Sequence, residues 1–180
     1  MNKLAILVAF LTLNVQPSYS LELYLGSITH HLIVHDGVES QFEGKIGAGG
    51  RTILNGLVGI ANTQIKGNTY VSHRVFFGEN SIHKWMLGAA ISWGYSKKYV
   101  DYGLIVGGYG QNHHFYHVRG IDAPALKVGS LGFLPVLGGE LIVHYPLSKN
   151  MTIGFANIVT PALTNHSILL RWAPNALVPQ

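Results

Sequence analysis

The feature that most constrains the fold is an alternation of larger and smaller residues with period two, clearest from Trp85 to Ser96. One set of alternate positions is apolar and mostly large: Trp85, Leu87, Ala89, Ile91, Trp93 and Tyr95. The other set is mostly small: Met86, Gly88, Ala90, Ser92, Gly94 and Ser96. Successive side chains of a β-strand point to opposite faces, so the pattern predicts a strand with an apolar outer face and a small inner face. The same alternation recurs at 137–145 and 151–156.

Extending this pattern along the chain predicts about eight strands. Their expected spans are 22–35, 51–63, 68–77, 85–96, 100–111, 132–145, 150–159 and 164–172. The connections after the second, fourth and sixth strands are short and polar, whereas those after the first, third and fifth are longer. Short turns at one rim and long loops at the other are typical of an outer-membrane barrel with both termini in the periplasm. We therefore predict an all-β fold, an eight-stranded antiparallel transmembrane β-barrel with up-and-down meander order.

The first twenty residues have the features of a secretory signal. Asn2 and Lys3 give a positive start, residues 4–13 are apolar, and residues 17–20 supply a helix breaker and small side chains. The apolar run is too short to span a bilayer, and we expect cleavage after Ser20. The predicted organisation is a signal peptide at 1–20 and one barrel domain at 21–180, with strands over about 22–172 and a tail at 173–180.

Composition excludes several classes of function. The chain has no cysteine, which excludes a disulfide scaffold, a zinc–cysteine site and a thiol nucleophile. Its net charge of +4 is not clustered, so we expect no nucleic-acid partner. Charged residues make up 11% of the chain, well below the value of about 25% for soluble proteins. A soluble barrel of the lipocalin kind is the structural alternative, and it would bury its apolar face inside.

The ten histidines do not predict a metal site. In a strand, His31 and His35 would lie about 13 Å apart, too far for one ion to bridge. His113, His114 and His117 are close in sequence but have no acidic or cysteine partner at ligand spacing. We expect no metal and no cofactor.

A histidine and a serine are predicted to meet at one mouth of the barrel. The first and third strands run in the same direction, so His31 and the Asn80-Ser81 pair lie at the same rim. Histidine can take a proton from a hydroxyl group, which is the minimum requirement for acyl transfer.

At these residues the sequence resembles the lipid A palmitoyltransferase (PagP) family. Leu23-Tyr24 and Ser27-Ile28-Thr29-His30-His31 are similar to the family's first strand, and the family's catalytic histidine falls on His31. Asn80-Ser81-Ile82-His83-Lys84-Trp85 resembles its Asp-Ser segment, so that Ser81 matches the catalytic serine. Trp93, Leu134-Pro135-Val136-Leu137, Pro161 and Arg171-Trp172 are similar to later family positions in the same order.

The resemblance implies an acyltransferase that moves a fatty-acyl chain from a phospholipid to lipid A. His31 would act as base, Ser81 as its hydroxyl partner, and Asn80, at the family's aspartate position, can orient an imidazole. The inner-face residues Gly88, Ala90 and Ser92 would leave room for the acyl chain, and Ser92 falls near a family glycine that limits its length.

We accordingly expect phospholipid and lipid A as partners, a monomer, and location in the outer membrane of a Gram-negative bacterium. A phage gene as the source is left open. Two other functions remain as alternatives. One is a non-catalytic small outer-membrane barrel with ligand-binding or surface-protective outer loops, and the other is a soluble periplasmic lipid-binding barrel.

Overall fold

The computed structural model describes residues 19–31, 52–79, 85–112, 117–118, 121–122, 126–128, 131–161 and 163–173. These residues form an antiparallel β-barrel. Its sheet has nine strands, of which all but the short β8 build the wall: β1 (Tyr19–His31), β2 (Thr52–Lys66), β3 (Thr69–Glu79), β4 (Trp85–Lys97), β5 (Val100–Asn112), β9 (Leu131–Pro146), β10 (Met151–Val159) and β11 (Leu163–Trp172).

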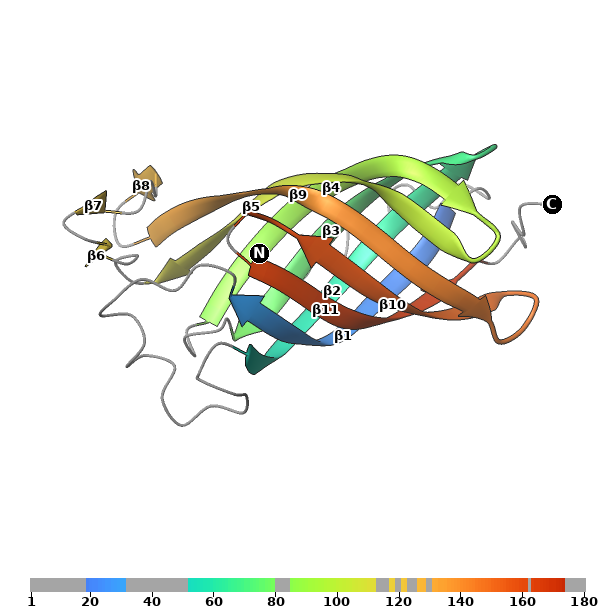
Figure 1. Cartoon of the computed structure of the whole chain (residues 1–180), viewed down its shortest axis with the longest axis horizontal. Helices are drawn as coiled ribbons and strands as arrows, with labels where there is room; N and C mark the ends of the chain where they lie inside the picture. The colour runs from blue at the N-terminus through green and yellow to red at the C-terminus, as the bar shows by residue number, and fades with distance from the viewer. Residues whose placement is uncertain are drawn as a thin grey trace, which may run out of the picture.

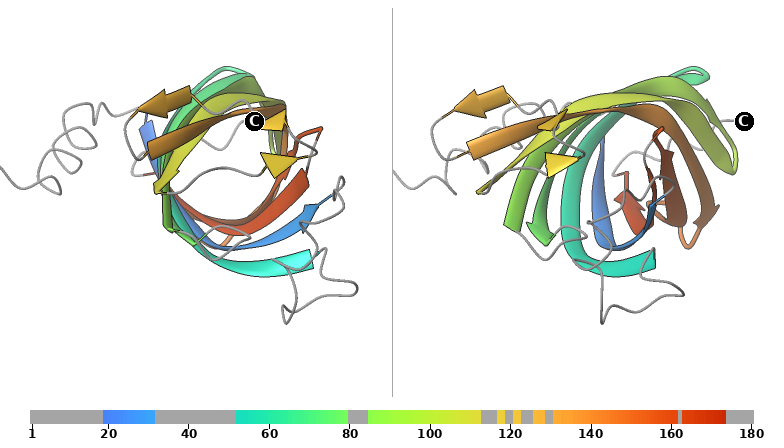
Figure 2. Two further views of the ribbon diagram at one scale, coloured as in Figure 1. Left: turned by 90° about the vertical axis from the view of Figure 1, so that its left-hand side faces the viewer. Right: turned by 60° about the vertical axis from the view of Figure 1, so that its left-hand side comes forward.

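Each wall strand pairs with the next one along the chain, and the last pairs with the first. β11 and β1 are joined antiparallel from Leu21↔Trp172 to His31↔Leu163, which closes the sheet into the ring seen in Figure 2. Closure leaves no long exposed edge at this seam. The predicted eight-stranded antiparallel meander is confirmed, and the strand bounds differ from the predicted spans by a few residues.

The first strand begins earlier than predicted. Tyr19 pairs with Gln64, and the buried Ser20 donates its hydroxyl to the carbonyl of Thr63 at 3.2 Å. β1 thus starts two residues before the expected cleavage site, and a chain cleaved there would begin its first strand at Leu21. The described part of the strand ends at His31, and residues 32–35 of the predicted span lie outside the described residues.

Three short strands lie between β5 and β9, where the sequence predicts only a long loop. β6 (His117–Val118) pairs with β7 (Ile121–Asp122), and β8 (Leu126–Val128) adds to the start of β9 through Leu126↔Phe133. Figure 1 places all three beyond the same end of the barrel.

The two ends of the barrel differ in their connections. At one end, which we call the turn end, tight turns at Gly67–Asn68, Lys98–Tyr99 and residues 147–150 join neighbouring strands. Gly67 has a φ of 60°, a left-handed conformation that favours glycine. The opposite end, the loop end, carries the long connections, of which only β6, β7 and β8 belong to the described residues. The predicted short turns are confirmed.

The strand alternation sorts side chains as the sequence predicts. Along β4, Trp85, Leu87 and Ile91 are exposed on the outer face, and Trp85 retains 61% of its surface. Gly88, Ala90 and Ser92 are buried on the inner face. Large apolar residues are exposed on the outer face of every wall strand. The apolar face of this barrel is therefore its outside.

A β-bulge keeps the inner face of β1 in phase. Against β11, three steps on β1 from Leu25 to Ile28 match only two steps from Ile168 to His166, and Gly26 within this stretch has a φ of 60°. Because the bulge inserts one extra residue, Ser27 and Thr29 are buried like Tyr24 before them.

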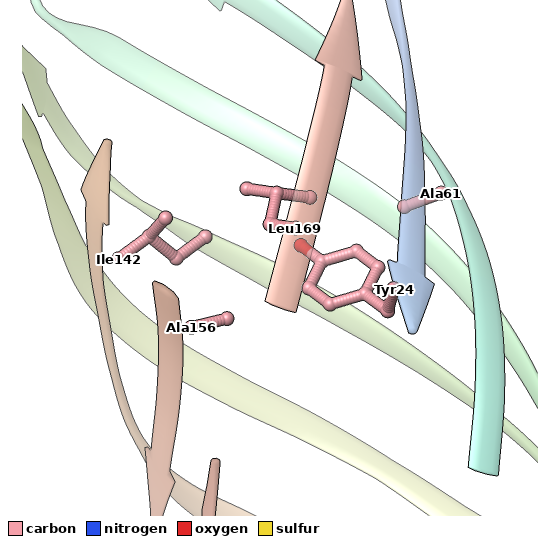
Figure 3. Packing of buried hydrophobic residues seen from close by; sticks show 5 residues of the cluster. All are labelled: Tyr24, Ala61, Ile142, Ala156 and Leu169. Carbon is pink, nitrogen blue, oxygen red and sulfur yellow. The ribbon is translucent and has the colours of Figure 1, made fainter. Parts of the chain in front are cut away.

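The barrel contains a small apolar cluster between its first and last strands. Figure 3 shows Tyr24, Ala61 and Leu169 from β1, β2 and β11 facing Ile142 and Ala156 from β9 and β10. Since Ala61 and Leu169 have no exposed surface, this cluster packs the seam at which the sheet closes.

The close pairing of Gly94 and Gly103 yields a test of the packing between β4 and β5. A Cβ atom at Gly94 would lie 2.1 Å from the carbonyl oxygen of Tyr102, so the backbone would have to shift. We expect Gly94→Ala to lower the free energy of unfolding by about 1–3 kcal/mol, measured by urea unfolding in detergent micelles. Gly139→Ala is the control, because its Cβ would meet nothing closer than 3.9 Å. An equal loss of stability in both variants would contradict the close backbone packing of β4 against β5 at Gly94.

Candidate functional site

The loop end brings the predicted catalytic segments to the same rim. His31 is the last residue of β1, and Asn80 and Ser81 directly follow Glu79, the last residue of β3. One strand, β2, separates β1 from β3, so the two strands lie about 10 Å apart across the sheet. Their ends are also offset along the strand direction by about 16 Å, because His30 pairs with Thr52 whereas Gly78 pairs with Leu57, five residues further along β2. Asn80, Ser81 and the side chain of His31 lie outside the described residues. Their meeting therefore stays a prediction, and the strand directions on which it depends are confirmed.

The predicted substrate-binding residues share the inner face of β4. Ala90 and Ser92 keep 6% and 1% of their surface, and Gly88 is also buried. The space above Gly88 is already filled, because a Cβ atom there would lie 2.0 Å from the ring of Phe76 on β3. Gly88 thus makes room for Phe76, whereas Ala90 and Ser92 line the interior directly.

Ion pairs fill the turn-end half of the interior. Arg171 contacts Glu22 at 2.7 Å and Asp101 at 2.6 Å. Asp101 also accepts the hydroxyl of Ser96 at 2.7 Å and lies 3.3 Å from Nε2 of His144. All five side chains are buried, so these contacts take the place of water around the charges.

A second group of contacts joins this network from β3 and β9. Arg74 contacts Glu140 at 2.7 Å as an ion pair without hydrogen-bond alignment, and its Nη2 donates to the hydroxyl of Tyr24 at 2.7 Å. Tyr24 donates in turn to Glu22 at 2.7 Å, and Tyr70 donates to Glu140 at 3.1 Å. The guanidinium of Arg74 also stacks on the Tyr24 ring, 4.2 Å from its centroid. Tyr24 thereby links the two groups into one network.

This network ties six wall strands together across the interior. Its members come from β1, β3, β4, β5, β9 and β11, and it sets the carboxylates of Glu22, Asp101 and Glu140 against the guanidinium groups of Arg74 and Arg171. The sequence patterns did not predict this network. The available signal was a single charge between outward-facing neighbours, as in Leu21-Glu22-Leu23 and Leu170-Arg171-Trp172, because such a charge must point inward.

The loop-end half of the interior is uncharged at the described inward positions. Beyond the network, β3, β4, β5 and β9 present an apolar wall: Phe76, Met86, Gly88, Ala90, Ile105, Gly107, Tyr109, Leu134, Val136 and Gly138. β1 and β11 present a polar strip, in which Asn165 donates to Thr29 at 3.0 Å and Ser167 donates to Asn165 at 3.3 Å. The hydroxyl groups of Ser27 and Ser92 are buried and have no hydrogen-bond partner among the described residues.

The wall is discontinuous between β9 and β10 at the loop end. Pairing of these strands stops at Gly139↔Val159, although β9 continues back to Leu131. Within the described residues, 134–138 of β9 pair with β5 alone, and Pro135, which has no N–H group, lies in this stretch. Among the described residues, this stretch of β9 therefore has one unpaired edge next to the uncharged half of the interior.

The network makes a specific prediction for stability. Replacing Arg171 by Met leaves the buried carboxylates of Glu22 and Asp101 without their shared cation, so we expect a loss of about 3–5 kcal/mol in the free energy of unfolding. Lys66→Met, at an exposed position beside a turn, is the control and should change it by less than about 0.5 kcal/mol. The measurement is urea unfolding in micelles, and similar values for the two variants would show that the ion pairs contribute little.

Comparison with known proteins gives no independent indication of function. No protein-family model and no curated protein sequence matches the chain. Among the residues that the structure describes, no group of three or more histidine or acidic side chains is placed to hold a metal ion, and no helix is long and apolar enough to cross a membrane.

Proposed function

We propose that the protein is an outer-membrane β-barrel that transfers a fatty-acyl chain from a phospholipid to lipid A. The proposal combines three elements: an apolar outer surface, an uncharged loop-end interior, and the resemblance of the His31 and Ser81 segments to the lipid A palmitoyltransferase family.

The outer surface supports a place in a membrane. Large apolar side chains are exposed around the whole ring, more than a soluble monomer usually shows. Aromatic side chains gather near the turn end. The ring centroids of Tyr95 and Tyr102 lie 5.6 Å apart there, and those of Tyr99 and Tyr145 lie 6.5 Å apart. At the loop end, Phe77 stacks on Trp85 at 5.0 Å. Two aromatic girdles flanking an apolar band are typical of outer-membrane barrels, and a lipocalin-like barrel would have the opposite polarity.

The loop-end interior is the observation that carries the activity. Its apolar wall on β3, β4, β5 and β9 suits an acyl chain, and its polar strip on β1 and β11 suits the ester end of a lipid. The ion-pair network closes the other half, so an acyl chain would end near Ala90 and Ser92. We propose that a lipid chain enters from the membrane at the unpaired edge of β9, beside β10.

The chemistry follows from the residues at the rim. His31 would take a proton from the attacking hydroxyl of lipid A, with Ser81 as a polar partner and the Asn80 amide orienting the imidazole. The acyl carbon would then form an ester with that hydroxyl, while the phospholipid oxygen leaves with the proton. Wall residues exclude water from the acyl chain, which favours transfer over hydrolysis.

Mass spectrometry of lipid A tests the activity directly. Cells that express the chain should contain lipid A with one added acyl group, and Ser81→Ala and His31→Ala should each abolish it. Ser148→Ala in a turn and His73→Ala on the outer face are matched controls and should keep it.

Unmodified lipid A, from a protein shown to be folded in the outer membrane by heat-modifiable gel migration, would refute the transferase. The function would then be that of a non-catalytic barrel.

The position of Ser92 predicts the length of the transferred chain. Ser92 is buried beside the network, so a larger side chain there raises the end of the apolar compartment. We expect Ser92→Met to transfer a shorter acyl chain than the unaltered protein, read from the added mass on lipid A. Ser148→Met is the control, and the same chain length in all three proteins would place the compartment's end elsewhere.

A further inference from the structure

A polar cluster interrupts the apolar outer face of the barrel on β10 and β11. Its members are Asn157, Thr164 and His166, which occupy outward positions close to the loop end. The surrounding outward side chains are large and apolar: Ile28, Phe155, Val159 and Ile168 are 38% or more exposed. Polar side chains on the lipid face of a barrel are costly, so three of them in mutual contact call for an explanation.

The register of the strands brings the three side chains together. Asn157 lies directly opposite His166 in the β10–β11 pair, and Thr164 stands two residues before His166 on the same face of β11. Nδ1 of His166 lies 2.7 Å from Oδ1 of Asn157, and Nε2 lies 3.3 Å from Oγ1 of Thr164.

The contacts of Asn157 determine which nitrogen of His166 carries the proton. The Asn157 amide nitrogen donates to the carbonyl oxygen of Leu141 at 3.2 Å, and a carbonyl can only accept. The amide oxygen therefore faces His166, so Nδ1 must be the donor. In the neutral ring, Nε2 then carries a lone pair directed toward the Thr164 hydroxyl.

The ring of His166 is also held from the side. Phe155 stacks on it with the ring planes 5° apart and the centroids separated by 5.8 Å. A hydroxyl group, a base that can take its proton, and a third group that orients the base are the three parts of a nucleophilic catalytic site.

We infer that Thr164, His166 and Asn157 form a second catalytic site, which cleaves the acyl ester of a membrane lipid from the outside of the barrel. Thr164 is the nucleophile, His166 the base, and Asn157 the positioning residue. The inference rests on the membrane placement in the proposed function, but it does not depend on acyl transfer to lipid A.

The location selects the substrate class. The cluster lies within three residues of the loop end of both strands, because β10 ends at Val159 and β11 begins at Leu163. In an outer-membrane barrel, this height is close to the level at which lipid acyl chains give way to their polar head groups. The bond found at that level is the ester of a glycerophospholipid. An ester is also the bond that a hydroxyl–imidazole pair can attack.

The reaction balances with water as the second reactant. Oγ1 of Thr164 attacks the ester carbonyl carbon while its proton passes to Nε2 of His166. The bond to the glycerol oxygen then breaks, and that oxygen takes the proton and leaves as a lysophospholipid. Water next attacks the acyl-threonine ester, giving its proton through His166 to Oγ1, which releases the fatty acid and restores the hydroxyl.

Purified full-length protein, refolded in micelles that contain phosphatidylethanolamine, tests the site. We expect release of lysophospholipid and fatty acid in equal amounts, measured by mass spectrometry. His166→Gln and Thr164→Val should each lower the rate of hydrolysis by about a hundredfold or more. Thr164→Ser keeps the hydroxyl group and should retain the hydrolysis. His73→Gln, the same substitution on the outer face of β3, is the control. A fluorophosphonate probe should attach to the peptide that contains Thr164.

The outcomes separate this site from the proposed transferase. Hydrolysis that is lost in His166→Gln but kept in Ser81→Ala supports the outer site, whether or not lipid A is acylated. Hydrolysis that is absent from the folded protein overturns the inference. So does hydrolysis that persists in Thr164→Val and His166→Gln but disappears in Ser81→Ala, which would assign the cleavage to the barrel mouth.

Discussion

Closure of the sheet through the β1–β11 pair is the constraint on which the rest of the structure depends. Once the first and last strands pair, every wall strand has a neighbour on both sides, and each side chain is assigned either to the interior or to the outside. The alternation along each strand then determines which side chains face the interior and which face outward. It places the large apolar residues on the outer surface and leaves a narrow interior for small, apolar and paired charged residues.

The interior that results has two chemically different halves. Arg74, Arg171 and their carboxylate partners occupy the turn end. Removal of one partner there would leave a buried charge without its ion pair. The loop end has no charge at its described inward positions, and among the described residues the edge of β9 around Pro135 is unpaired on the side of β10. In the proposed function, the ion-pair network forms the closed end of the acyl compartment. The same arrangement of strands therefore gives a rigid turn end and an accessible loop end.

Local patterns predicted much of this architecture. Period-two alternation and short polar turns predicted the wall strands, their order and the inward positions of Gly88, Ala90 and Ser92, because both signals depend on neighbours in sequence. The additional strands β6, β7 and β8 were missed because two- and three-residue strands are too short for a repeating pattern. The sequence did not predict that the ring of Phe76 fills the space above Gly88, because that ring comes from a different strand.

The sequence by itself determined which residues form strands and which face each side chain takes, since both follow from the pleat of a single strand. Only the tertiary structure decided which polar residues meet. Glu22 and Arg171 are 149 residues apart in sequence, and their contact exists because the ring closes. Asn157 and His166 meet because of the register of two strands. Contacts across a closed sheet depend on closure and register together, and neither can be read from one strand alone.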